Sequence, residues 1–237
     1  MKHTNTLSQY QFLNGSHLKL LAVITMLIDH IALVLTPCLP ILQATLFAQF
    51  TVYGIMRKIG RLAFPLFCFL LAEGFYYTKN RLHYGRNLLI FALISELPYN
   101  LMKCGRLFYP DAQNIYITLL LGFCVLWLLD SPWKLYWKLP ILVLIVLFAP
   151  HLRAGYGREG ILLIVLLYAL REKRLASSLL ALPLLSGGVA AWAAFVPIGL
   201  YNGKRGFISG NLLKYAFYAF YPAHMLLLYG IRLMLSR

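Results

Sequence analysis

Charged residues are scarce in this chain: only 12% of its 237 residues are Asp, Glu, Lys or Arg, about half the share in typical soluble domains. Acidic side chains are the rarest, with 7 Asp and Glu against 22 Lys and Arg. Hydrophobic residues make up 61% of the chain, and its mean hydropathy is +0.72. A soluble protein of this size cannot bury so much apolar surface. The composition therefore excludes a cytosolic enzyme, a disordered chain and a secreted disulfide scaffold, and predicts a polytopic membrane protein.

The sequence also lacks the short motifs that identify many sites. Its four cysteines, Cys38, Cys68, Cys104 and Cys124, form no CxxC pair, so we predict free thiols, no disulfide and no metal site. No HExxH, GxSxG or Walker pattern occurs. Residues 1–16 are polar and contain no apolar h-region, so we expect no cleavable signal peptide and a cytoplasmic N-terminal segment before a retained first span.

The net charge of +15 would suggest a nucleic-acid partner in a soluble protein. Here most Lys and Arg residues lie between apolar runs, where the positive-inside rule places them. No basic stretch is interleaved with stacking aromatic residues, as a groove for single strands requires. We therefore predict the lipid bilayer, and no nucleic acid, as a partner.

The predicted fold is an all-α, polytopic helical bundle with about nine transmembrane helices (eight to ten), forming a single domain over residues 1–237. Every span must be helical because lipid offers no partners to exposed backbone groups. Several apolar runs are shorter than the about 20 residues that a perpendicular span needs, so some borders are expected to shift. The nine runs cover residues 18–36, 62–78, 86–102, 113–129, 139–150, 160–170, 175–185, 189–201 and 212–235.

The stretch 37–60 is ambiguous, because Pro37 and Pro40 interrupt it and its composition is mixed. If it does not cross the membrane, the cytoplasmic loops are 79–86, 130–138, 171–174 and 202–211, and all are basic. If it crosses, the turn at 171–174 faces outward. We therefore expect a re-entrant or interfacial segment. This topology leaves some basic residues outside that need another explanation, notably Arg57, Lys58, Arg61, Arg153 and Arg158.

Lys19 and His30 are eleven residues apart on the first predicted span. At about 100° per residue they are about 20° from exact alignment and about 16 Å apart along the axis. Lys19 would lie near the cytoplasmic interface and His30 deep in the membrane, where an imidazole can take and return a proton. This arrangement suits a long anionic donor that enters from the cytoplasm. The alternative is a snorkelling lysine with an unrelated buried histidine.

Asp29 precedes His30 within the same apolar run, and ionisable residues inside a span are costly and usually mark function. Neighbours on a helix point about 100° apart. Asp29 is therefore not expected to orient His30 directly, but to pair with Arg61 or another cation. The alternative is a structural Asp–Arg pair beside a satisfied core histidine.

Other polar residues interrupt apolar runs. Arg61 lies at a predicted membrane edge and could bind a carboxylate or phosphate through two hydrogen bonds, whereas the carboxylate of Glu73 needs a partner. Tyr221 and His224 flank Pro222, which indicates either a lined cavity or a kink whose freed carbonyls are bonded by neighbours. Three more polar residues lie near span ends, where most such residues are caps or loop residues: Glu96, Asn114 and Tyr156.

Together these residues resemble the TraX family of bacterial membrane proteins along most of the chain. That family resembles the membrane acyltransferase-3 family, in which an Arg or Lys precedes a His by the spacing of Lys19 and His30. Glu73 departs from the acyltransferase-3 pattern, which has Ser in a Phe-rich SGF stretch, and we interpret this as a TraX feature. The matching stretches are Lys19 to His30, GRLAFPLF at 60–67, EGFYYT at 73–78, Arg86, SELPYN at 95–100, Asn114, GYG at 155–157 and FYPAHMLLL at 220–228.

The resemblance implies an integral inner-membrane acyltransferase that moves an acyl group, expected to be acetyl, from cytoplasmic acyl-CoA to an amine or hydroxyl near the outer face. A pilin N-terminus, as in conjugation, or an envelope glycan would be the acceptor; the identity of the acceptor does not carry over. Acetyl-CoA is the expected donor substrate and no metal is expected.

The resemblance also implies roles for individual residues. His30, with Asp29 beside it, would be the catalytic base or a transient acyl carrier. The CoA phosphates would be bound by Lys19, Arg81 and Arg86. Asp29, Arg61 and Glu73 would position the acceptor or hold the site together, and His224 would line the far side of the cavity.

A transporter or flippase is the alternative function. Its sequence signature would be paired Gly/Pro-broken spans in corresponding halves, but the interruptions at Pro65, Pro98 and Pro222 do not pair obviously. A scaffold without chemistry leaves the ionisable residues within spans unexplained. Binding of acyl-CoA separates an acyltransferase from a transporter.

Overall fold

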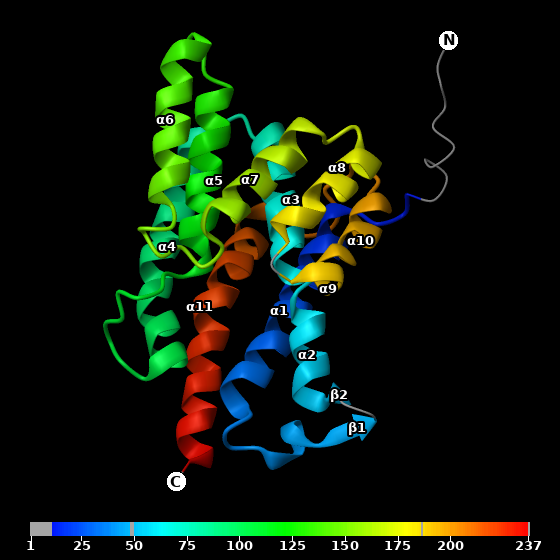
Figure 1. Ribbon diagram of the computed structural model, residues 1–237, viewed down its shortest axis with the longest axis vertical. Coiled ribbons are helices and arrows are strands. Elements are labelled where there is room, and N and C mark those ends of the chain that lie inside the picture. Colours follow the sequence, from blue (N-terminus) through cyan, green and yellow to red (C-terminus); the bar gives the residue numbers. More distant parts are fainter. Residues whose placement is uncertain (1–10, 48–49, 186, 237) are drawn as a thin grey trace.

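The computed structural model describes residues 11–47, 50–185 and 187–236, and helices dominate these residues (Figure 1). Only a small antiparallel hairpin, β1 (Thr45–Phe47) with β2 (Phe50–Thr51), departs from the helical pattern. The prediction of an all-α fold is therefore confirmed in outline.

Seven of the nine predicted runs form single helices with shifted borders. Capping residues explain two of the shifts: Asn14 accepts hydrogen bonds from two backbone N–H groups at the start of the first helix, and Asn80 accepts one at the start of α4. The helices are α1 (Gly15–Leu35), α3 (Ala63–Tyr77), α4 (Arg81–Cys104), α5 (Ile115–Leu129), α6 (Leu135–Phe148), α7 (Gly157–Ala169) and α11 (Gly210–Leu235).

The runs 175–185 and 189–201 are not continuous helices, which corrects the predicted span borders. They form α8 (Arg174–Ala181), the 3₁₀ turn η3 (Leu182–Leu184), α9 (Gly188–Trp192) and α10 (Phe195–Gly199). Pro183 and Pro197 explain the breaks, because a proline lacks the N–H that continues a helix and its ring clashes with the carbonyl four residues earlier. Within the described residues, α1 alone is both long and apolar enough to cross a membrane by itself.

The ambiguous stretch after α1 folds back on it. It contains the 3₁₀ turn η2 (Pro40–Gln43), the hairpin and the nine-residue helix α2 (Val52–Gly60), which is too short to cross a bilayer. α2 packs along α1 and leads into α3, so the two helices rise in the same direction beside α1 (Figure 1).

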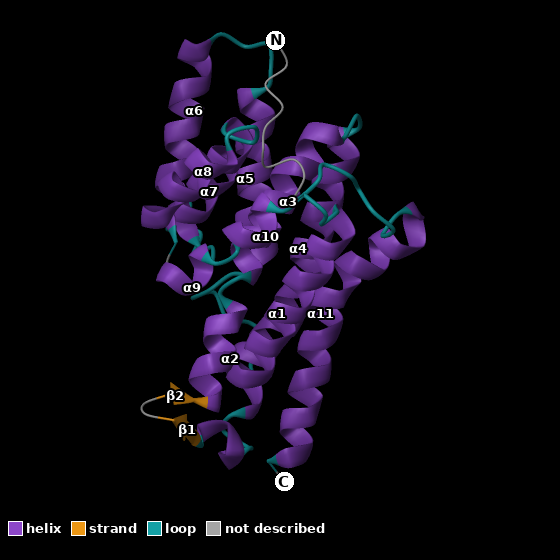
Figure 2. Ribbon diagram, turned by 90° about the vertical axis from the view of Figure 1, so that its right-hand side faces the viewer, coloured by secondary structure: helices purple, strands orange, loops and turns teal. Residues whose placement is uncertain are grey.

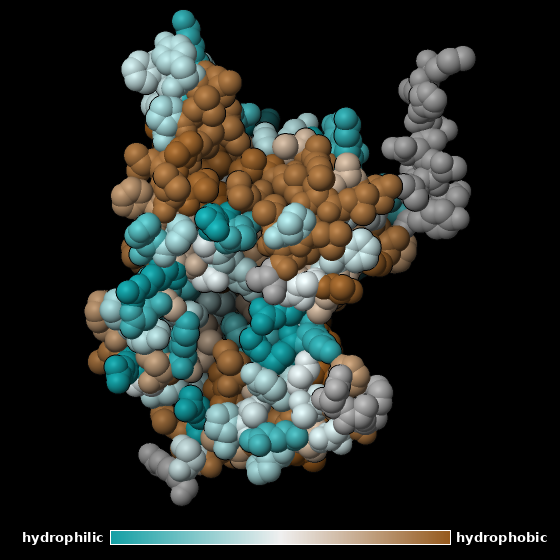
Figure 3. Space-filling view, viewed as in Figure 1, coloured by the Kyte–Doolittle hydropathy of each residue, from teal (hydrophilic) through white to brown (hydrophobic). Residues whose placement is uncertain are grey.

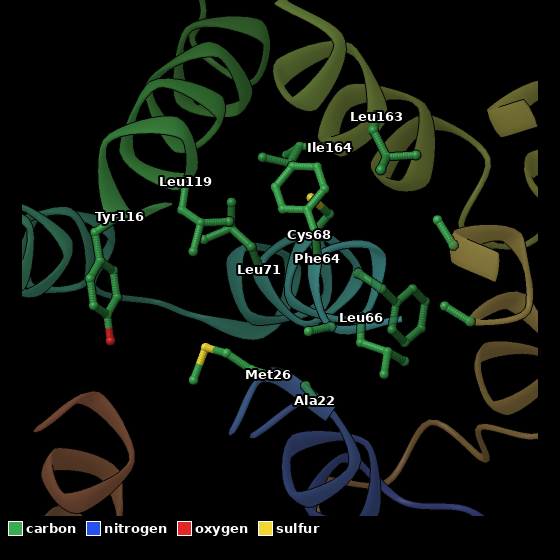
Figure 4. Close-up of a cluster of buried hydrophobic side chains, with 14 of the residues drawn as sticks. Ala22, Met26, Phe64, Leu66, Cys68, Leu71, Tyr116, Leu119, Leu163 and Ile164 are labelled. Atoms are coloured by element: carbon green, nitrogen blue, oxygen red, sulfur yellow. The ribbon is translucent and has the colours of Figure 1, made fainter. Parts of the chain in front are cut away.

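Five helices form a closed ring in the order α1, α11, α4, α5 and α3, each in contact with the next. α1 and α11 run side by side toward the C-terminal end (Figure 2). α7 covers α3 and α5, and buried side chains such as Leu119, Ile164 and Leu66 fill the space between these helices (Figure 4). α6 lies outside this core, and none of its side chains is buried. A hydrophobic band covers this upper part of the molecule (Figure 3).

The ion pair Arg81–Asp130 joins two of the loops predicted to be cytoplasmic. Three further contacts connect the other two loops to neighbouring segments: the ion pair Arg171–Glu73 and the hydrogen bonds from Arg174 to the Tyr201 carbonyl and from the Gly15 N–H to the Lys204 carbonyl.

Three of the basic residues predicted to face outward pair with carboxylates, as Arg57–Asp29, Arg153–Asp111 and Arg158–Glu159. Lys58 lies over the ring of Phe50 and keeps its charge. The ion pairs therefore account for only part of the outward positive charge.

Gly60 permits the close contact between α1 and α2. A Cβ atom at this position would overlap the Asp29 side chain. We expect Gly60→Ala to lower the free energy of unfolding by about 1–3 kcal/mol, because the helices must move apart. Thermal unfolding in detergent would measure this. Gly230→Ala is the matched control, since a Cβ there meets nothing within 4 Å, and it should be neutral or stabilising. Equal melting temperatures for the two variants would contradict the packing argument.

Candidate functional site

A cavity of about 550 Å³ lies inside the five-helix ring, with walls from α1, α3, α4, α5 and α11. Lys19, Val23 and Met26 line it from α1, on the face that also carries His30 at helical spacing. Its walls are mostly apolar, with polar groups concentrated near the loops at one end. The cavity therefore has a polar mouth and an apolar interior.

Three cations surround the mouth of the cavity: Lys19, Arg205 and Lys214. None of them forms an ion pair with a carboxylate among the residues that the structure describes. Lys19 lies over the ring of Phe217, with Nζ 5.7 Å from the ring centroid. The mouth therefore carries positive charge that a bound anion would neutralise.

His83 contributes to the same mouth. Its Nε2 lies 3.1 Å from Lys214 Nζ, and its Nδ1 lies 3.0 Å from a guanidinium nitrogen of Arg86. The charge of Lys214, burial and the charge of Arg86 lower the pKa of His83 below its usual value. The imidazole is therefore neutral at pH 7 and can accept a hydrogen bond from one of its two cationic neighbours.

Glu73 lies in the cavity wall and is 9% exposed. Its carboxylate is 3.6 Å from Arg171 Nε, which supplies the partner that the sequence required. The Arg171 guanidinium also lies over the ring of Tyr76. Glu73 is thus a paired wall residue that joins α3 to the loop between α7 and α8.

The inner end of the cavity is built from tyrosines. Tyr116 and Tyr221 meet edge to face, 5.3 Å between ring centroids, and the Tyr116 hydroxyl points away from α5 toward α11 (Figure 4). It donates a 3.0 Å hydrogen bond to the carbonyl of Tyr218. Pro222 has no N–H to offer this carbonyl. Both interpretations of the Pro222 kink are therefore right: the freed carbonyl is satisfied, and the residues around it line a cavity.

His30 lies one helical turn beyond Met26, next to this inner end. Its Nδ1 is 2.6 Å from Nε2 of His224 on α11, and the two ring planes are within 9° of parallel. Tyr221 packs against both rings. His224 is 4% exposed and is a partner of His30 rather than a residue of the cavity lining, which corrects the predicted position.

The hydrogen bonds determine which ring nitrogens carry protons when both imidazoles are neutral. Nδ1 of His224 lies 2.7 Å from the carbonyl of Phe220, which can only accept, so this nitrogen carries the hydrogen. Nε2 of His224 is then an acceptor, and Nδ1 of His30 must donate to it. The lone pair of His30 is left on Nε2, the form that a general base requires.

Asp29 does not contact His30, in line with the expectation from helix geometry. Its carboxylate pairs with Arg57 at 2.6 Å, whereas Arg61 makes no ion pair with it within 4.0 Å. Arg57, and not Arg61, is thus the partner that the sequence left open.

The arginines expected to bind CoA phosphates lie outside the cavity walls. Arg81 pairs with Asp130 and covers the ring of Phe75. Arg86 is exposed and reaches the mouth only through His83. Arg205 and Lys214 occupy the mouth in their place.

Three further predicted residues have structural partners. Asn114 caps α5 through the N–H of Tyr116 and donates to Glu96 at 2.7 Å. Tyr156 stacks on Phe64, with ring centroids 3.4 Å apart. These contacts hold α4, α5 and α7 around the cavity.

Sequence inspection missed Arg57, His83, Arg205, Lys214 and Tyr116. The signal for the mouth residues was available, because Lys214 and Arg205 lie in or beside a predicted cytoplasmic loop that also leads into the last span. All four cysteines are free thiols; Cys68 is buried, as its apolar run predicts, whereas Cys124 is exposed. Within the described residues, no cluster of three metal-ligating side chains occurs.

Comparison with known proteins adds to this geometry. The family model of the TraX protein matches residues 14–232. The chain is 29% identical over 247 residues to the probable fimbrial assembly protein FimC, serogroup H1, of Dichelobacter nodosus, covering 92% of this chain and 96% of that protein. It is also 35% identical over 111 residues to an uncharacterized protein of Rickettsia prowazekii (strain Madrid E), covering 46% of this chain and 35% of that protein. No solved structure matches the chain.

Proposed function

The chain belongs to the TraX protein family, and on this premise we propose that it is an integral membrane acyltransferase that uses acetyl-CoA. The observation that carries the proposal is the His30–His224 pair, which uses Nδ1 of His30 and leaves its Nε2 as the lone-pair nitrogen. The pair itself is outside the lining of the cavity with the basic mouth, but Tyr221, which packs against both rings, belongs to that lining.

Three features support a multi-pass location in the bacterial inner membrane. The hydrophobic band of Figure 3 covers several helices, and α6 exposes large apolar side chains such as Leu144 and Leu147. An apolar surface of this extent requires a partner, and lipid needs no specific shape. The basic loops at one end of the ring fit the cytoplasmic side.

The cavity suits an acyl-CoA in charge and in length. Lys19, Arg205 and Lys214 would hold phosphate groups at the mouth, where their charges lack carboxylate partners. Lys19 and His30 are about 16 Å apart along α1, so a long narrow arm is needed to join the two ends. The apolar interior of the cavity would accept such an arm and exclude water. Acetyl-CoA supplies an activated acetyl group as a thioester.

His30 would perform the proton transfer. Its Nε2 takes the proton of an amine or hydroxyl on the acceptor while that nitrogen or oxygen forms a bond to the acetyl carbon. The carbon–sulfur bond breaks, and the proton passes from Nε2 to the departing sulfur, so charge and protons balance. His224 and the Phe220 carbonyl keep the His30 ring in the required tautomer.

A pilin subunit is the acceptor that we favour. A protein that matches this chain along almost the whole length of both is named a probable fimbrial assembly protein. This name is consistent with a pilin-related role for the family. The amine of such a subunit would reach His30 from a side other than the donor's mouth.

Acetyl-CoA binding and hydrolysis by the purified protein in detergent would test the proposal. We expect saturable binding and slow thioester hydrolysis, with water replacing the acceptor. If no CoA ester binds, the proposal fails, and the ionisable residues inside the bundle should be tested as a transport pathway.

Lys19→Gln should weaken acetyl-CoA binding about 10- to 100-fold, because a charge-assisted hydrogen bond contributes about 1.5–3 kcal/mol. Equilibrium dialysis with labelled acetyl-CoA would measure the change in Kd. Lys19→Arg keeps the charge and should retain most of the affinity. Lys173→Gln removes an equal charge from an exposed position outside the cavity and should change Kd by less than about twofold. Equal losses in the two glutamine variants would contradict a role for Lys19 at the mouth.

A further inference from the structure

A second cavity, of about 660 Å³, lies between the C-terminal end of α2 and the start of α9. Its lining residues are Arg57, Lys58, Arg61, Gly187, Val189 and Ala190. It shares no lining residue with the first cavity, which has the basic mouth.

Positive charge dominates this second cavity. Three of its six lining residues are cations, and Asp29 is the carboxylate that pairs with them, through Arg57. Arg61 has no carboxylate within 4.0 Å among the residues that the structure describes. The cavity therefore carries an excess of positive charge that a bound anion would neutralise.

The backbone is shaped around Arg61. A Cβ atom on Gly187 would lie 3.0 Å from Arg61 Cβ and 3.1 Å from Arg61 Cδ, so a side chain at this position would press on the arginine. Gly188 follows with φ +57°, a conformation that favours glycine. The two glycines let the turn pack directly against the stem of Arg61 at the cavity wall.

The second cavity is linked to the catalytic pair through Asp29 and Arg57. Asp29 is the neighbour of His30 and points about 100° around α1 from it. Arg57 donates a 2.6 Å hydrogen bond to the Asp29 carboxylate. A ligand in the second cavity would thus be joined, through this one ion pair, to the residue next to His30, while the first cavity holds the donor.

We propose that the second cavity binds a carboxylate or phosphate group that the acceptor carries near its reactive amine or hydroxyl. Arg61 is the principal anion contact, Lys58 adds charge, and Arg57 connects the bound anion to Asp29. The assignment of this anion to the acceptor rests on the proposed acyltransferase function, whereas anion binding by this cavity does not. An anionic lipid headgroup has the same chemistry and is the competing source of the anion.

Rates of cysteine modification would measure the electrostatic potential in this cavity without any acyl transfer. Val189 lines the cavity and is 79% exposed. Val189→Cys would be made in a background with the four native cysteines replaced. Two reaction rates of this cysteine would then be compared, one with the anionic 2-sulfonatoethyl methanethiosulfonate and one with the cationic 2-trimethylammonioethyl methanethiosulfonate. Arg61→Gln should lower the ratio of anionic to cationic rates about tenfold, since a unit charge about 6 Å away changes each rate about threefold in opposite directions. Val196→Cys, which is 61% exposed on α10 and outside the cavity lining, is the control whose ratio should not change.

Protection experiments would identify the anion. Glycerol 3-phosphate should slow the anionic reagent at Val189→Cys and lose this effect in Arg61→Gln. An unchanged rate ratio in Arg61→Gln, or no protection by glycerol 3-phosphate, overturns the proposal. Protection by micelles doped with phosphatidylglycerol but not with phosphatidylcholine, without protection by glycerol 3-phosphate, assigns the cavity to lipid and overturns the acceptor site. Because neither measurement uses acetyl-CoA, failure of the acyltransferase proposal would be seen separately.

Discussion

Acetyl transfer should fall about 10²- to 10⁴-fold in His30→Ala, the range that a general base contributes. Acetyl-CoA binding should change little, because the cations of the mouth lie about 16 Å away along α1. The loss is therefore expected in kcat, with the Kd for acetyl-CoA within about twofold of wild type. Initial rates of thioester cleavage at saturating acetyl-CoA, beside a binding isotherm, would measure both quantities.

The control for this substitution is His151→Ala, which removes an exposed histidine from the turn after α6 and should leave both quantities unchanged. His30→Ala also leaves Nε2 of the buried His224 without a partner, so thermal unfolding must be measured alongside. A folded His30→Ala protein that retains full transfer would exclude His30 as the base.

The second large effect is expected at His224, which positions His30 without touching substrate. His224→Leu removes the acceptor that holds the Nδ1 proton of His30. Loss of one buried hydrogen bond, about 1.5–3 kcal/mol when it involves a charged group, corresponds to about 10- to 100-fold in kcat. His224→Gln supplies an amide oxygen as an acceptor of similar reach and should restore much of the rate.

A pH profile separates this positioning role from a purely structural one. The rate in His224→Leu should depend on pH with a displaced acidic limb, because that limb reports protonation of the general base and the hydrogen bond at Nδ1 sets the basicity of Nε2. The KM for acetyl-CoA should stay near the wild-type value. Equal rates and equal pH profiles in the leucine and glutamine variants would show that His224 only fills space.

The alignment of Lys19 with His30 could be predicted because both lie on one uninterrupted helix. Helical periodicity then determines which side chains share a face, and α1 follows it from its Asn14 cap to Leu35. The same periodicity separated Asp29 from His30 correctly. Asn114 was likewise identifiable as a cap, since Asn before an apolar run satisfies the first free N–H groups.

Partners on different helices could not be predicted in this way. The His30–His224 contact joins residues 194 positions apart, and neither helix determines where the other packs. The choice of Arg57 over Arg61 for Asp29 depends on α2 folding back on α1 across Gly60. The resemblance placed Arg81 at the donor site, but it is held by Asp130 from the loop between α5 and α6.

By itself, the sequence determined the helical class, the basic end of the bundle and which side chains share a face of α1. Hydropathy, charge and helical period are local properties of the chain. Only the tertiary structure decided which helices close the ring, which cations reach the mouth, and which histidine orients His30. These outcomes depend on side-chain packing between segments distant in sequence, where a shift of one helical turn replaces every partner.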